Sequence, residues 1–152
     1  MPLISEKPIF VLTSPLGDIQ MLGKTPYGER RIIDIHGGTV EGERLKGTVL
    51  PGGADWQIVR DDGVVHLTAR YTIKADTGGL ILVNAEGYRH GPPEVMARLA
   101  RDETVDPSLY YFRTFMRFET SDPAAAWLNR ILAIGYGARA NKQVRIEAFE
   151  VL

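Results

Sequence analysis

The clearest pattern in the chain is an alternation of apolar and polar residues over short segments. Within Leu67–Lys74 every second residue is apolar or aromatic and the residues between them are polar, which is the period of a half-buried β-strand. The turn Asp76–Gly79 follows, and Leu80–Glu86 then begins with residues that are apolar on both faces, as in a central strand. Together these segments predict a β-hairpin.

Further segments of strand length have the same character. They lie at Ile9–Ser14, Ile19–Leu22, Arg31–His36, Glu43–Leu50, Asp55–Val59, Tyr110–Thr120, Asn129–Ala138 and Val144–Val151. With the hairpin this makes about ten strands, separated by turns rich in the 16 Gly and 9 Pro of the chain. Regular turn signals between short strands favour an antiparallel barrel or sandwich. Because no linker or repeat interrupts the pattern, we expect one domain over residues 1–152.

One segment has helical periodicity instead. In Pro93–Glu103 the apolar residues Val95, Met96 and Leu99 share one stripe, and Pro93 suits the first helical turn. The segment predicts one short helix near 93–103, which we interpret as plugging or flanking a sheet. Pro123–Leu128 is long enough only for a turn of helix before the next strand.

Composition narrows the classes of function. The chain has 152 residues, no Cys, and 18 basic against 19 acidic residues. Thiol chemistry is therefore absent, and the balanced charge argues against a nucleic-acid or membrane surface. The N-terminal residues lack the features of a signal peptide, so we expect a cytoplasmic protein. From the frequency of symmetric assemblies we also expect a homodimer or higher homo-oligomer.

Motifs for metals and cofactors are missing. His36, His66 and His90 are far apart in the sequence, without metal-ligand spacing. Gly37–Thr39 and Pro51–Asp55 lack the helix and the Lys-Ser/Thr ending of a phosphate loop, and no serine nucleophile elbow occurs. We therefore expect no metal and no cofactor.

The segment Tyr110–Thr120 carries the most conspicuous polar residues. Alternation places Arg113 and Glu119 on one face, together with two aromatic residues, and an apolar core set on the other. The mixed face is either a solvated outer surface or the wall of a ligand cavity. Asp55 and Trp56 follow a glycine turn, where Trp56 either seals one end of a barrel or stacks on a ligand.

Three further residues have alternative interpretations. Trp127 is most simply a core residue. Asn129, placed here on a strand, is disfavoured by propensity and so suggests a hydrogen-bonding role. Arg89 stands at a strand end, where an exposed loop arginine is the default interpretation.

Several short motifs together resemble one known family. They are Gly37-Gly38-Thr39 with Gly42 and Gly47, Pro51–Trp56, Tyr110–Thr114, Phe118–Thr120 and Trp127–Asn129. Over about residues 8–151 the chain resembles the uncharacterised family called domain of unknown function 3237. The resemblance implies a closed antiparallel β-barrel of about 8–10 strands with a central cavity, similar to lipocalin and streptavidin barrels. It implies no settled activity, although cyclisation of polyketide-like substrates has been proposed for some relatives.

Three classes of function remain open. The first is a barrel that binds a small hydrophobic or aromatic, partly anionic molecule, with tryptophans as walls and arginines as anchors. The candidate ligand-binding residues are Trp56, Arg70, Tyr71, Arg89, Arg113, Trp127 and Asn129. The second is a cofactor-free cyclase or isomerase in which Asp55 or Glu119 acts as general base and an arginine with Tyr71 stabilises an oxyanion. The third is a non-catalytic assembly domain whose interior is filled by side chains.

Overall fold

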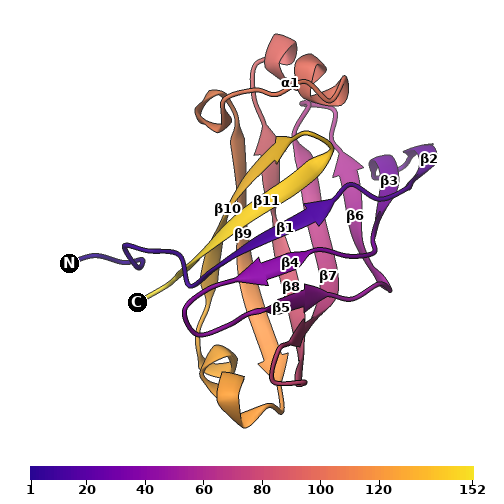
Figure 1. Ribbon diagram of the computed structural model, residues 1–152. Coiled ribbons are helices and arrows are strands. Elements are labelled where there is room, and N and C mark those ends of the chain that lie inside the picture. Colours follow the sequence, from indigo (N-terminus) through magenta and orange to yellow (C-terminus); the bar gives the residue numbers. More distant parts are fainter.

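The computed structural model describes residues 1–152 and consists mostly of β-strands (Figure 1). The strands are β1 (Phe10–Pro15), β2 (Ile19–Thr25), β3 (Gly28–Ile35), β4 (Thr39–Glu41), β5 (Gly47–Val49), β6 (Gly53–Val59), β7 (Val65–Ala75), β8 (Leu80–His90), β9 (Tyr111–Thr120), β10 (Ala133–Ala140) and β11 (Gln143–Glu150). The helices are α1 (Pro93–Ala100) and two 3-10 helices, η1 (Pro107–Leu109) and η2 (Pro123–Arg130). In Figure 1, α1 lies at one end of the barrel and η2 at the other.

Eight of the strands close into an antiparallel barrel. Their order is β7-β5-β4-β1-β11-β10-β9-β8, and pairing of β8 with β7 completes the ring. The three remaining strands branch off β7, because its first half pairs with β6 and its last residues pair with β5. Strands β3 and β2 continue this branch beyond β6. The predicted closed antiparallel barrel is thereby confirmed.

Alternation along the strands fills the interior. On β7 the buried residues are Val65, Leu67, Tyr71, Ile73 and Ala75, which belong to a single core cluster of 25 buried residues. The segment Tyr111–Thr120 behaves in the same way. Strand β9 buries Phe112, Thr114, Met116 and Phe118, and the alternate residues, Arg113 and Glu119 among them, point outward. The period-two pattern therefore determines which side chains reach the inside of the barrel.

Some element boundaries differ from those expected. Strand β8 continues to His90 instead of ending near residue 86, and the short strand β4 was not predicted. The predicted strand over 129–138 begins only at Ala133, because η2 extends to Arg130 after Asp122 caps its first turn. Helix α1 ends at Ala100 instead of continuing to residue 103, and Asp102, two residues later, has a left-handed backbone with a φ of 62°. None of the helices is long and apolar enough to cross a membrane.

Strand β2 is the free edge of the sheet. It pairs with β3 on one side only, and its residues Ile19, Met21 and Leu22 are all more than half exposed. An uncovered apolar edge is a common site of strand pairing between molecules. The expected homo-oligomer nevertheless stays a prediction.

A glycine on β10 makes room for an aromatic ring inside the barrel. A Cβ on Gly137 would lie 2.5 Å from the ring of Phe112. We expect Gly137→Ala to lower the free energy of unfolding by about 1–3 kcal/mol, because the ring must move within a packed interior. Urea denaturation measures this. Gly37→Ala is the control, since a Cβ there meets nothing within 4 Å, and an equal loss in both variants would contradict the packing argument.

Candidate functional site

A cavity lies inside the barrel, between the β6-β3 branch and strands β1, β10 and β11. Its walls are mostly apolar, with Leu12, Ile33, Leu67, Phe112 and Ile146 among them. The cavity volume is about 100 Å³, measured as the space that the centre of a water-sized molecule can reach. A single water needs roughly 10–15 Å³ on this measure. The cavity therefore has room for a small organic molecule and is too small for a polymer.

Asp55 is the buried one of the two acidic residues that line this cavity, because the other, Asp34 on β3, is exposed. Asp55 stands on β6, opposite Ile33 of β3 and Ala69 of β7, which are cavity residues as well. Its Oδ1 accepts a hydrogen bond from the Thr68 N–H at 3.1 Å, and its Oδ2 accepts one from Gln57 Nε2 at 2.7 Å. Burial raises the pKa of the Asp55 carboxyl, while Gln57, Arg89, Thr68 and Arg31 partly oppose the rise.

Gln57 fixes the orientation of this carboxylate. Its side chain is 1% exposed, and its Oε1 accepts a hydrogen bond from Arg31 Nε at 2.7 Å. Because Arg31 can only donate, the amide of Gln57 must turn its NH₂ group toward Asp55. The three residues form a chain of hydrogen bonds from β3 to β6. Burial lowers the pKa of Arg31, against the opposing charges of Glu29 and Asp55.

Arg89 is the most unusual residue in the cavity. It lies on β8 between Val65 of β7 and Phe112 of β9 and is only 4% exposed. Its Nε is buried without a hydrogen-bond partner, and no ion pair includes it. Its guanidinium carbon lies 5.6 Å from the centre of the Phe112 ring. Burial, followed by the charges of Arg139 and Arg31, lowers the pKa of Arg89 to about 9, so at neutral pH it remains a cation.

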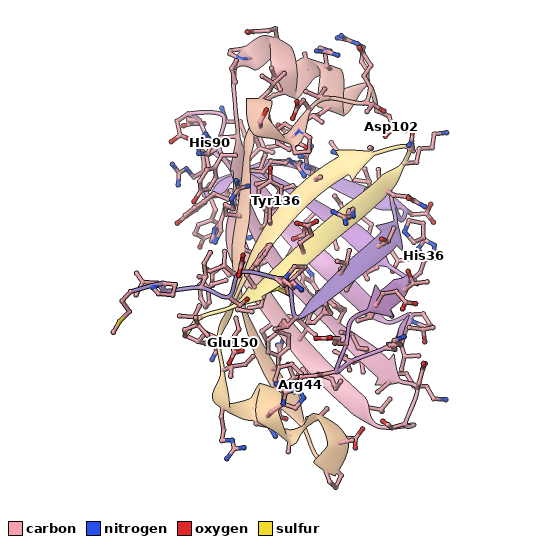
Figure 2. All side chains as sticks on the ribbon, turned by 60° about the vertical axis from the view of Figure 1, so that its left-hand side comes forward. His36, Arg44, His90, Asp102, Tyr136 and Glu150 are labelled. Atoms are coloured by element: carbon pink, nitrogen blue, oxygen red, sulfur yellow. The ribbon has the colours of Figure 1, made fainter.

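Arg139 and Tyr71 add further polar groups to the walls. Arg139 on β10 lines the cavity, and its Nε is also buried without a partner. Burial lowers the pKa of Arg139, although the charge of Asp102 opposes this; Figure 2 shows Asp102 beside the end of the β10-β11 hairpin. Burial, with a contribution from Asp55, raises the pKa of the Tyr71 phenol. Tyr71 is therefore a neutral hydroxyl in the cavity.

Three residues proposed from the sequence lie outside the cavity. Trp56 and Arg70 are on the outer face of the sheet, because their neighbours Asp55 and Ala69 point inward. Arg70 borders a separate, shallow hollow on that face. Arg113 also points outward, and its guanidinium carbon lies 4.0 Å from the ring centre of Tyr136.

The remaining sequence candidates have structural contacts elsewhere. Trp127 belongs to η2 and packs against the core, and the guanidinium carbon of Arg44 lies 3.8 Å from its ring centre. Figure 2 labels Arg44 close to this end of the barrel. Asn129 is in η2, where its Oδ1 accepts from the Thr120 N–H and its Nδ2 donates to the Thr120 carbonyl. Glu119 is exposed on the outer face of β9. Tyr71, Arg89 and Asp55 are thus the sequence candidates that the cavity brings together.

Sequence reasoning missed Arg31, Gln57 and Arg139. Gln57 and Asp55 are two residues apart on one strand, so alternation alone places Gln57 on the face of Asp55. Arg139 follows the end of the predicted strand at Ala138, so alternation assigns it to neither face. No group of three or more His, Asp or Glu side chains is close enough to hold a metal ion. The polar side chains that line the cavity are two carboxylates, one phenol, one amide, two hydroxyls and two guanidinium groups, from Asp34, Asp55, Tyr71, Gln57, Ser14, Thr114, Arg89 and Arg139. Arg31 is bonded to one of them, Gln57.

The raised pKa of Asp55 has a consequence for the pH dependence of stability. A carboxyl whose pKa is higher in the folded than in the unfolded chain binds its proton more tightly when folded, so it costs stability once ionised. We expect the melting temperature of Asp55→Asn relative to wild type to increase between pH 4 and pH 8. Thermal melts across this range measure the difference, with the exposed Asp61→Asn as control. If the melting temperature of Asp55→Asn fell relative to wild type as the pH rises, Asp55 would not be a carboxylate whose ionised form is destabilised by burial.

A family model and a relative of known sequence both match nearly the whole chain. The model of the family described as "Protein of unknown function (DUF3237)" matches residues 4–151. A UPF0311 protein of Rhodopseudomonas palustris is 42% identical over 151 residues, which cover 99% of each chain.

Solved structures have the same fold. The crystal structure of a conserved protein of unknown function from R. palustris has a TM-score of 0.91 at 42% identity and covers 100% of this chain and 99% of its own. A β-barrel-like protein of Acinetobacter baumannii has a TM-score of 0.83 at 42% identity, covering 99% and 97%. An enzyme from Penicillium herquei is similar in fold alone, with a TM-score of 0.70 at 19% identity over 99% and 97% of the chains.

Proposed function

The chain belongs to the DUF3237 family of proteins of unknown function, and from the chemistry of its cavity we propose that it binds a small hydrophobic or aromatic molecule with an anionic group. The observation that carries this proposal is Arg89, a cation 4% exposed whose Nε has no acceptor. A buried cation without a partner costs folding free energy. An anion in the cavity supplies the missing acceptor and charge.

The surroundings of Arg89 favour an apolar molecule with one charged group. Leu67, Phe112 and Ile146 form walls that favour a hydrocarbon or aromatic frame. Arg139 lines the same cavity and has a second unpartnered Nε, so two guanidinium groups are available for one anion. The open cavity also argues against the third class, an assembly domain with a filled interior.

Titration with benzoate tests the proposal. Benzoate has an aromatic ring and a carboxylate, and benzamide has nearly the same shape without the charge. We expect benzoate to bind at one site per chain and benzamide to bind at least about 10-fold more weakly, because hydrogen bonds to a charged group contribute about 1.5–3 kcal/mol. Isothermal titration calorimetry measures both. Equal affinities, or no binding of either compound, would contradict an anion site.

A second function is favoured by Asp55, whose pKa is raised by burial within the same cavity. In a cofactor-free isomerase, Asp55 would take a proton from a carbon next to a carbonyl group, and Arg89 would stabilise the resulting oxyanion. Return of that proton to another carbon of the same molecule balances the reaction. The Penicillium herquei protein with this fold is described as an enzyme. Glu119 is no longer a candidate base, because it lies on the outer surface.

Deuterium exchange tests the second function. If Asp55 removes such protons, the wild-type protein should speed the exchange of the α-protons of 2-indanone in D₂O, and Asp55→Asn should lose most of this effect. NMR spectroscopy follows the loss of the proton signal. Equal exchange rates with wild type, with Asp55→Asn and without protein would leave binding as the function.

A further inference from the structure

We propose that the ligand is a hydroxy acid, in which an apolar frame joins an anionic group held by Arg89 and Arg139 to a hydroxyl group that donates to Asp55. This inference rests on the proposed binding function and specifies its chemical class. It follows from the hydrogen-bonding capacity that the protein leaves unused inside the cavity.

Asp55 has acceptor capacity that no protein group uses. Each of its carboxylate oxygens has about two lone-pair sites, and each accepts one hydrogen bond, Oδ1 from the Thr68 N–H and Oδ2 from Gln57. The carboxylate lines the cavity. Two donors therefore hold Asp55 in place at the cavity wall, and the protein leaves its remaining acceptor sites without a donor.

Two hydrogen-bond donors in the same cavity also lack a partner. The Nε–H groups of Arg89 and Arg139 are buried without acceptors, and no carboxylate lies within ion-pair distance of either side chain. The protein thus does not pair Asp55 with Arg89, although both line one cavity and each affects the pKa of the other. A single ligand that carries both a donor and an anionic acceptor complements the unused acceptor and the unused donors of this cavity.

The walls between these groups limit what the ligand can be. They include Leu67, Ala69 and Ala85 on β7 and β8, which offer no hydrogen bonds through their side chains. A polar molecule such as a sugar acid would leave its other hydroxyl groups unpaired against these walls, at a cost for each. An acid with few hydroxyl groups on an aromatic or aliphatic frame fits better.

Affinities of matched benzoates test the proposal. The probes are benzoate, its 2-, 3- and 4-hydroxy derivatives, and the corresponding methoxy compounds, in which the hydroxyl loses its proton to a methyl group. We expect at least one hydroxybenzoate to bind the wild-type protein about 10-fold or more tightly than benzoate, as for a hydrogen bond to a charged acceptor. Its methoxy counterpart should show no such gain.

The variant Asp55→Asn identifies the acceptor. Its preference for the hydroxybenzoate over benzoate should fall below about 3-fold, because the charged acceptor of the hydroxyl is removed. Benzoate binding with no gain from any hydroxyl, or a gain that persists in Asp55→Asn, would overturn the hydroxy-acid inference alone. Failure of every probe to bind the wild type would instead overturn the proposed function. The methoxy comparison needs only the wild-type protein, so the test stands even if the variant does not fold.

Discussion

Replacing Arg89 by methionine is expected to weaken benzoate binding strongly while it makes the ligand-free protein more stable. Benzoate affinity should fall about 30-fold or more, because the carboxylate loses charge-assisted hydrogen bonds in an apolar cavity. The free energy of unfolding should rise by about 1–3 kcal/mol, since methionine fills a similar space without a buried charge. Asp55 keeps its hydrogen bonds to Gln57 and Thr68 in this variant. Calorimetric titration and urea denaturation measure the two effects.

The control for this prediction is Arg70→Met. Arg70 is the arginine on the outer face of β7, and it is exposed and takes part in no ion pair. It should change neither benzoate affinity nor stability by more than about 0.5 kcal/mol. If Arg89→Met destabilised the protein and kept its affinity, Arg89 would be a structural residue. Opposite changes in stability and binding are expected of a site whose unfavourable charge is kept for a ligand.

Filling the cavity is the second change with a large expected effect. Ala69 lies on β7 opposite Asp55 and Ala85, with its methyl group in the cavity wall. We expect Ala69→Phe to reduce benzoate binding below detection, because its ring occupies the space of the ligand ring. The melting temperature should stay within a few degrees of wild type, because the ring enters open space rather than a packed core. Titration calorimetry and a thermal melt measure these results.

The adjacent residue offers a matched control. Thr68 precedes Ala69 on β7 and pairs with Glu86, and both border the hollow on the outer face. Thr68→Phe adds the same ring on the opposite side of the sheet and retains the backbone N–H that donates to Asp55. It should bind benzoate as the wild type does. Loss of binding in both variants, or in neither, would contradict the placement of the site inside the barrel.

The alternation of apolar and polar residues carries most of the information that the sequence holds about this fold. Alternation in Leu67–Lys74 and in Tyr110–Thr120 identifies both the strands and their buried faces, because side chains of a strand point to opposite sides in turn. The branching of the sheet at β7 is not visible in this way. It depends on β7 pairing with β6 along one half and β5 along the other, which are contacts between distant segments.

The site was harder to predict for the same reason. Asp55, Tyr71 and Arg89 could be proposed from their residue types, but alternation is identical for a strand whichever of its faces points inward. Trp56 and Arg113 are as unusual in the sequence as Arg89, yet they belong to outer faces. The sequence pattern ends β8 near residue 86 and therefore favours a loop position for Arg89. The three extra residues of strand as far as Arg89 are what bring it inside the barrel.

A crystal structure of the wild-type protein with bound benzoate tests the central claim most directly. The account predicts a benzoate ring between Leu67 and Phe112 and a carboxylate within hydrogen-bond distance of the guanidinium groups of Arg89 and Arg139. A carboxylate that points out of the cavity into solvent, or benzoate bound only on the outer face of the barrel, would contradict it.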